Sequence, residues 1–135
     1  GETIALGEVG VHGEGRDLAI VSYANGAYRA HQAAAILAAE GARARVVDLR
    51  WLAPLPADAL LEAVAPCERV LIVDECRITG SQSEALMALF AERAPGVPVA
   101  RLAAEDCFIA TGPAYGATLP SRDGIVAAAR RLAER

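Results

Sequence analysis

Charged and hydroxyl side chains gather in one short stretch, residues 73–84, with the sequence VDECRITGSQSE. Glu75 and Arg77 follow an apolar run, whereas Gly80 and Ser81 come at the start of a segment of helical composition. The first amides of a helix form an electropositive end that suits a bound anion. These four residues are therefore our candidates for binding a small anion or a partner.

The same residues also fit a structural role. Ser81 and Glu84 have the spacing of a capping box, in which a hydroxyl and a carboxylate satisfy the free amides of a helix start. Asp74, Glu75 and Arg77 are typical of an exposed, ion-paired loop. No Ser-His-Asp order or isolated acid-base pair accompanies them. The sequence therefore predicts a capped helix and a structural or partner-facing loop, with no catalytic or cofactor-binding residue.

Lysine, cysteine and histidine narrow the chemistry further. All thirteen basic residues are Arg, which excludes a Schiff-base lysine, a P-loop lysine and the lysine of phospho-acceptor receiver domains. Cys67, Cys76 and Cys107 are widely spaced, and only His12 and His31 could join them. Neither their number nor their spacing fits a closed zinc site, so no metal site is predicted. Three scattered thiols suit a reducing compartment.

The length and composition of the chain limit the classes of protein to which it could belong. At 135 residues and 54% hydrophobic content, the chain fits one globular domain. Its net charge is -4, with acidic and basic residues interleaved, so nucleic-acid binding is not expected. The apolar runs are shorter than the roughly 20 residues that span a bilayer, and the first residues lack the pattern of a signal peptide. We expect a soluble, cytoplasmic chain with no membrane partner.

Short apolar runs alternate with longer helical segments along the chain. The runs 17–23, 44–49, 69–74 and 97–103 are almost continuously apolar, as in parallel strands that are covered on both faces. The segments 26–41, 57–65, 81–94 and 122–135 are predicted helices. This order predicts an α/β fold, a three-layer α/β/α sandwich with a five-stranded, mostly parallel sheet. Its fifth member is an antiparallel edge strand within 4–15, expected to form a hairpin with 17–23.

In such a sheet, the loops at the carboxyl ends of the strands meet along one edge, where ligands bind. The residues expected along that edge are Asn25, Asp48, Arg50, Asp74, Glu75, Arg77, Glu105 and Asp106.

Three motifs in order carry a resemblance to a known family: VVDLRWLAPLP at 46–56, VDECRITGSQSEAL at 73–86 and AEDCFIATGPA followed by TLPS within 104–121. With them, the sequence resembles the C-terminal domain of transketolase-like, thiamine-diphosphate-dependent enzymes. It is most similar to the beta subunit, or its fused equivalent, of the decarboxylating component of 2-oxo acid dehydrogenase complexes. The family's common Gly-Gly-x-Gly is here Gly80-Ser81-Gln82-Ser83, which keeps the helix start but alters any backbone contact with an anion.

The resemblance implies that residues 17–135 form the transketolase C-terminal-like domain, and that 1–16 hold an edge strand and the connection from a preceding domain. Thiamine diphosphate and magnesium would bind to the preceding domains, because the family's Gly-Asp-Gly…Asn motif is absent here. The chain alone would then be inactive and would serve assembly. Its implied partners are a second copy, the thiamine-binding domains or an alpha subunit, and the acyltransferase core of the complex.

Two alternatives remain open. The chain could be an independent α/β module that binds a small anion at the strand-end edge, or the C-terminal domain of another transketolase-like enzyme. A mean hydropathy of +0.30 is high for a small domain, so we expect uncovered apolar surface and a homodimer. That surface is expected on an outer helix face or in the segment 108–120, which holds Phe108, Ile109, Tyr115 and Leu119.

Overall fold

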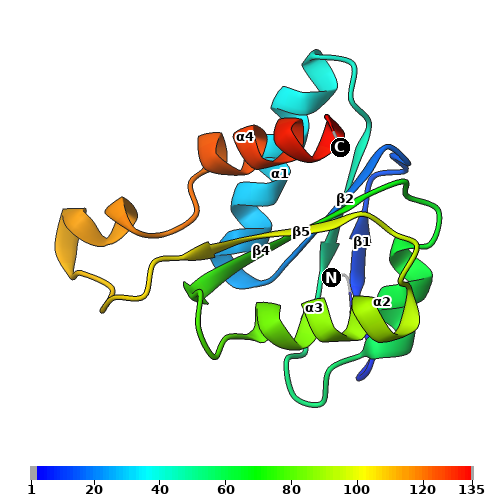
Figure 1. Ribbon diagram of the computed structural model, residues 1–135, viewed down its shortest axis with the longest axis horizontal. Helices are drawn as coiled ribbons and strands as arrows, with labels where there is room; N and C mark the ends of the chain where they lie inside the picture. Colours follow the sequence, from blue (N-terminus) through cyan, green and yellow to red (C-terminus); the bar gives the residue numbers. More distant parts are fainter. Residues whose placement is uncertain (1–2, 135) are drawn as a thin grey trace.

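The computed structural model describes residues 3–134 and has a five-stranded sheet at its centre, in the order β1-β3-β2-β4-β5 (Figure 1). β1 is antiparallel to β3, and all other neighbouring strands are parallel. This confirms the predicted α/β sheet with one antiparallel edge strand. The strands are β1 (Gly10–His12), β2 (Leu18–Ser22), β3 (Ala44–Asp48), β4 (Val70–Arg77) and β5 (Val99–Ala104).

Four α-helices cover the two faces of the sheet and complete the three layers (Figure 1). α1 and α4 lie together on one face, whereas α2 and α3 lie on the other. They are α1 (Ala24–Ala39), α2 (Ala57–Val64), α3 (Gln82–Arg93) and α4 (Arg122–Ala133), and a 3₁₀ helix that was not predicted spans Gly112–Ala117. None of the helices in the described part of the chain is long and apolar enough to cross a membrane.

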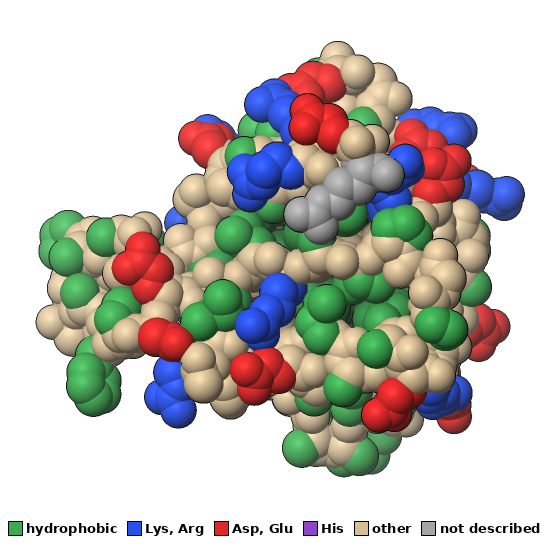
Figure 2. Space-filling view, viewed as in Figure 1, with side chains coloured by type: hydrophobic (Ala, Val, Ile, Leu, Met, Phe, Trp, Pro, Cys, Tyr) green, Lys and Arg blue, Asp and Glu red, His purple; other side chains and the backbone are tan. Residues whose placement is uncertain are grey.

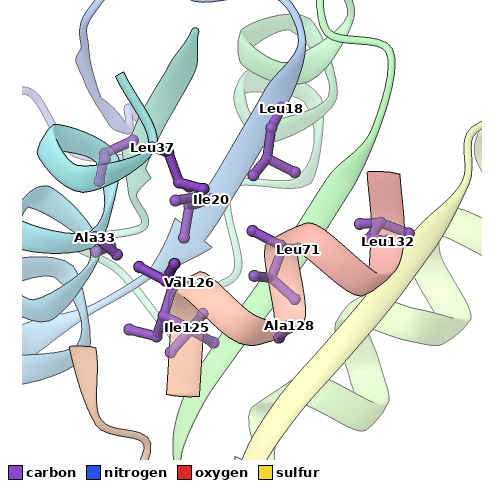
Figure 3. Close-up of a cluster of buried hydrophobic side chains, with 13 residues drawn as sticks. Leu18, Ile20, Ala33, Leu37, Leu71, Ile125, Val126, Ala128 and Leu132 are labelled. Carbon is purple, nitrogen blue, oxygen red and sulfur yellow. The ribbon is translucent and has the colours of Figure 1, made fainter. Parts of the chain in front are cut away.

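The sheet separates two hydrophobic cores because successive side chains of a strand point to opposite faces. Ile20 of β2 packs on the α1 and α4 side with Ile125 (Figure 3), whereas Val21 packs on the other side with Phe90. All four are at most 1% exposed. Burial of an aliphatic or Phe side chain contributes about 1.5–3 kcal/mol, so these strands are held from both faces, as their continuous apolar sequence predicted.

The prediction that β1 forms a hairpin with β2 is wrong, since β1 pairs with β3 through Gly10 opposite Asp48. The chain after β1 passes beside the start of β3 before it enters the middle of the sheet. Gly15 permits this passage, because a Cβ there would lie 2.3 Å from the carbonyl oxygen of Arg43. Gly15 thus allows a close crossing of two backbone segments between β1 and β2.

β4 continues past its predicted end at residue 74. It reaches Arg77 with an irregularity in its pairing to β5 between Asp74 and Arg77. Glu75 therefore lies within an irregular strand end, and the connecting loop before α3 is shorter than expected.

Residues 105–121, here called the arm, project from the end of the sheet between β5 and α4 (Figure 1). Figure 2 shows apolar side chains gathered over its projecting tip. Phe108 is fully exposed, and Ile109 and Tyr115 are about half exposed. Leu119 is partly buried. The arm therefore carries much of the uncovered apolar surface that the composition predicted, with Leu119 the least exposed of the four named residues.

Candidate functional site

The candidate site lies where the winding of the sheet reverses, between β2 and β4. From β2 the chain leads to β3 on one side, while β4 and β5 lie on the other. In open α/β sheets, ligands bind outside the carboxyl ends of the strands at such a point. Tyr23 follows β2 here, and Asp74 and Glu75 lie near the end of β4.

Asp74 is the centre of a buried hydrogen-bond network. Only 1% of it is exposed, yet its carboxylate accepts three hydrogen bonds. The Tyr23 hydroxyl and the Cys76 amide donate to Oδ1 at 2.6 and 2.9 Å, and the Ser83 amide donates to Oδ2 at 2.7 Å. The last bond joins the end of β4 to the first turn of α3.

The protonation states of Asp74 and Tyr23 fit a structural role better than a role in acid-base catalysis. Burial acts to raise the pKa of Asp74, but the hydrogen bonds from Tyr23, Cys76 and Ser83 outweigh it and hold the pKa below its usual value. Burial, followed by the hydrogen bond to Asp74, raises the pKa of Tyr23. Asp74 therefore stays ionised and Tyr23 stays protonated near neutral pH, which leaves neither ready to exchange a proton.

Glu75 reaches across to the start of α1. Its Oε1 accepts a hydrogen bond of 3.0 Å from the Gly26 amide. Ala24 has a positive φ of 48° at the sharp turn from β2 into α1. Gly26 is required there because a Cβ would lie 2.2 Å from the Ser22 hydroxyl, which itself donates to a backbone carbonyl of β4. The protein's own carboxylate thus occupies part of the electropositive start of this helix.

The capping role of Ser81 differs from the prediction. Ser81 is the N-cap residue of α3, but its side chain accepts no hydrogen bond from a helix amide. Its hydroxyl lies 2.8 Å from that of Ser83, whose amide is satisfied by Asp74. Glu84 Oε2 accepts from the Gly80 amide rather than closing a capping box at Ser81. The prediction of a reciprocal capping box is therefore wrong, because the buried carboxylate of Asp74, rather than the Ser81 hydroxyl, accepts the hydrogen bond of a helix amide.

These contacts bear on the predicted anion site. The amides of Gly80 and Ser83 already donate to Glu84 and Asp74, so an anion bound at either of these two amides would have to displace a carboxylate of the protein. The assignment of Glu75, Arg77, Gly80 and Ser81 to anion or partner binding stays a prediction. Glu75 lies apart from the other three, at the start of α1.

Arg77 lies at the exposed end of β4 beside the arm. Its Nε donates to the Thr79 carbonyl oxygen at 3.0 Å. Thr79 in turn donates to the Asp106 carboxylate, from its amide at 2.9 Å and from its hydroxyl at 2.6 Å. An open hollow of about 400 Å³ lies here, lined in part by Cys107 and Phe108. The network anchors the base of the arm to β4.

Asp48 and Arg50, two more of the predicted strand-end residues, lie near β1, whereas Asn25 lies at the start of α1 and Glu105 in the arm. Arg50 pairs with Asp48 at 2.7 Å, and the rings of His12 and His31 meet edge to face with their centroids 4.7 Å apart. Burial, and then the neighbouring His12, lowers the pKa of His31. This group is distinct from the Asp74 network, so the predicted edge residues do not form one site.

Tyr23 and Ser83 are the members of the Asp74 network that the sequence did not single out. Tyr23 is the last residue of an apolar run and resembles a further strand residue. The residues around it therefore do not indicate that its hydroxyl forms a hydrogen bond with Asp74. Ser83 belongs to the polar stretch before α3, but nothing in the spacing marks its amide as the partner of Asp74.

The described residues do not bring together a set of ligands for magnesium. Within residues 3–134, no three His, Cys, Asp or Glu side chains converge as a metal site. Asp74, the buried carboxylate at the strand-end edge, is already occupied by donors of the chain itself.

Several known proteins are similar to this chain. It is 32% identical to the pyruvate dehydrogenase E1 component subunit beta of Bacillus subtilis over 98% of the chain and 42% of that protein. It is 46% identical over 72 residues to the beta subunit of acetoin:2,6-dichlorophenolindophenol oxidoreductase from Cupriavidus necator, covering 53% of the chain and 21% of that subunit. A solved structure described as a split gene transketolase, inactive beta4 tetramer, superposes with a TM-score of 0.82 at 28% identity, covering 97% of this chain and 44% of that one.

The chain thus spans about two fifths of the length of the pyruvate dehydrogenase beta subunit that it matches. Residues 7–125 match the family described as transketolase, C-terminal domain. The fold agrees with this match, as do the similar proteins over nearly the whole chain. The chain therefore belongs to the transketolase C-terminal domain family.

Proposed function

We propose that this chain is the assembly domain of a thiamine-diphosphate-dependent 2-oxo acid dehydrogenase, in the beta subunit of its decarboxylating component. It associates with a second copy and with thiamine-binding domains or an alpha subunit, and the whole enzyme serves an acyltransferase core. Residues 1–16 lead in from a preceding domain, and 17–135 form the assembly domain. The match to a pyruvate dehydrogenase beta subunit over 98% of the chain supports this assignment.

The observation that carries the proposal is the exposed apolar surface of the arm. Phe108 is fully exposed, with Ile109 and Tyr115 about half exposed on the same projecting segment. Contiguous apolar surface on a small domain favours a protein interface. A stable contact of this kind buries more than about 1,000 Å² in total, which the arm would supply together with neighbouring surface.

The solved relative supports self-association. Its description as an inactive beta4 tetramer fits a chain that assembles with copies of itself yet needs further parts for activity. The Asp74 network fits the second point, because its ionised carboxylate and protonated phenol are held by internal hydrogen bonds.

Sedimentation velocity at micromolar concentration tests the assembly role. The wild-type chain is expected to form dimers or larger oligomers, and Phe108→Ser to shift the population toward monomer. Leu6→Ser is the matched control, because Leu6 is an exposed apolar residue outside the arm. A strictly monomeric wild-type chain, or equal effects of the two substitutions, would contradict the role of the arm.

Activity tests the second half of the proposal. The chain alone is expected to show no decarboxylation of pyruvate or branched 2-oxo acids and no binding of thiamine diphosphate tighter than about 100 μM. The same chain joined to its thiamine-binding domains is expected to decarboxylate a 2-oxo acid. Tight cofactor binding by the chain alone would refute the assignment.

The substrate of the whole enzyme has a second candidate. The 46% identity over 72 residues to an acetoin oxidoreductase beta subunit favours acetoin as an alternative to a 2-oxo acid. Assaying the joined enzyme with acetoin and with pyruvate, using the same artificial electron acceptor, separates the two.

A further inference from the structure

A cavity of about 300 Å³ lies between the start of α1, the end of β4 and the arm. Glu75 and Arg29 are charged residues of its lining, and both are partly buried. The arm supplies Tyr115, Gly116 and Leu119. The cavity therefore combines two opposite charges with a partly apolar wall, beside the point where the sheet reverses its winding.

The two charges are not paired with each other. Among the described residues, Arg29 forms no ion pair, and Glu75 uses only Oε1, in its bond to the Gly26 amide. Surface Arg residues of this chain commonly pair with a neighbouring carboxylate, as Arg130 does with Glu40. The lining of one cavity thus includes an Arg and a Glu whose charges are not paired with another side chain in the described part of the chain.

A ligand that pairs with both Arg29 and Glu75 must itself carry one negative and one positive charge. A carboxylate suits the planar, bidentate donors of Arg29, and an ammonium suits the free oxygen of Glu75. The side chain of such a ligand would lie against Tyr115, Leu119 and Pro120 of the arm. The cavity is at the lower end of the roughly 300–1,000 Å³ of ligand pockets, which limits the ligand to a small molecule.

We propose that this cavity binds a free α-amino acid with an apolar side chain. The carboxylate of the amino acid meets Arg29, its ammonium meets Glu75, and its side chain packs on the arm. The inference rests on the lining of the cavity and does not depend on the proposed function of the whole enzyme.

L-leucine is the probe for the first test, and amide chemical shifts of the folded chain are the readout. Saturable shifts are expected at the amides of Gly26 and Ser121, which line the cavity. Two analogues each lack one charge: 4-methylpentanoate has no ammonium, and 3-methylbutylamine has no carboxylate. Both are expected to bind about tenfold more weakly or worse, since each leaves one charge-assisted hydrogen bond unmade.

Substitutions of the two charges supply the second test. Glu75→Gln keeps an acceptor for the Gly26 amide but removes the charge, and Arg29→Gln removes the guanidinium. Each is expected to weaken L-leucine binding by about tenfold. Glu92→Gln on α3 and Arg131→Gln at the end of α4 change the same charges on exposed helix surfaces outside the cavity, and are expected to leave binding unchanged.

A cavity-filling substitution completes the design. Gly116 lines the cavity, and a Cβ there would meet no atom within 4 Å. Gly116→Phe is expected to abolish binding while the chain stays folded. Gly96 in the turn before β5 is equally open, so Gly96→Phe is the matched control and is expected to bind as the wild type does.

Three results would overturn the inference. The first is the absence of saturable amide shifts at Gly26 and Ser121 when L-leucine is raised to about 10 mM, which is about ten times the Kd of a ligand that binds at about 1 mM. The second is equal binding of L-leucine and 3-methylbutylamine, which would mean that the carboxylate is not recognised. The third is unchanged binding in Gly116→Phe, checked by circular dichroism to be folded, which would place the ligand elsewhere.

Discussion

Substitution of Asp74 by Asn should destabilise the chain more than any other polar change at the strand-end edge. The carboxylate is buried and accepts from the Tyr23 hydroxyl and from the amides of Cys76 and Ser83. An Asn side chain has one accepting oxygen and one NH₂ group. In either orientation, the NH₂ group faces a backbone N–H within about 3 Å, so one buried donor loses its acceptor.

The size of the effect follows from these contacts. A buried donor that is left unsatisfied costs about 1–3 kcal/mol, and hydrogen bonds to a charged group contribute more than neutral ones. Asp74→Asn should therefore lower the free energy of unfolding by about 3 kcal/mol. Ser81→Ala should cost about 1 kcal/mol or less, since it removes only one hydroxyl contact.

Urea denaturation followed by circular dichroism measures both changes. The control is Asp58→Asn, because Asp58 is highly exposed and pairs only with Arg93 at 2.7 Å on the surface. That control should change the free energy of unfolding by less than about 1 kcal/mol. A cost for Ser81→Ala equal to that for Asp74→Asn would refute the conclusion that Asp74, rather than Ser81, satisfies the start of α3.

The pH dependence of unfolding provides a second readout of the same carboxylate. The pKa of Asp74 is lower in the folded chain than its usual value. Its stabilisation is therefore fully present above the unfolded pKa of about 3.9 and is lost as the pH falls through the lower folded pKa. The wild type should lose stability below about pH 4 more steeply than Asp74→Asn. Parallel curves would contradict this account.

Three further outcomes are expected from urea denaturation. Gly26→Ala should lower the free energy of unfolding by more than about 1 kcal/mol, because its Cβ would lie 2.2 Å from the buried Ser22 hydroxyl. Gly96→Ala is the control, because a Cβ at Gly96 meets open space. Equal losses in the two variants would contradict this reasoning. Arg77→Ala should change stability by less than about 1 kcal/mol, since its side chain is exposed; a larger loss would mean that it holds the fold. Ile125→Ala should cost about 2–5 kcal/mol by opening a cavity in the core between α4 and the sheet, and a smaller loss would show that this core can close around the gap.

The central strands could be predicted because their sequence reports burial directly. Residues 17–23 and 69–74 are almost continuously apolar, and β2 and the first part of β4 are buried on both faces. Helices between them follow from composition and from stops such as Gly41, whose φ is positive. These signals are local, so no tertiary information was needed to order the elements.

The strand that pairs with β1 could not be predicted from the local sequence in the same way. Alternation along 4–15 indicates a strand, but the choice between β2 and β3 depends on contacts between distant segments. The hairpin expectation follows the rule that consecutive strands often pair. Here the close passage of Gly15 against Arg43 lets β2 take the central place instead.

The start of α3 shows a second limit of sequence reasoning. The spacing of Ser81 and Glu84 matches a capping box, yet the helix is satisfied by Asp74, nine residues before the amide of Ser83. A buried carboxylate makes a stronger hydrogen bond than a hydroxyl, and the folded chain brings Asp74, near the end of β4, within 2.7 Å of this amide. A local motif therefore predicted where the helix begins but not which side chain holds it.

The attachment of the arm has a consequence for how this domain can diversify. Its base is held to the segment that follows β4 by the bonds of Thr79 to Asp106, and the two ends of the arm are joined to each other by the Glu105 amide, which donates to the Thr118 carbonyl oxygen. The exposed apolar side chains at its tip make no part of either core. Under the proposed assembly role, changes at Phe108 or Ile109 would alter the partner of the domain without loosening the sheet, so that one stable scaffold could form new assemblies through a few substitutions in the arm.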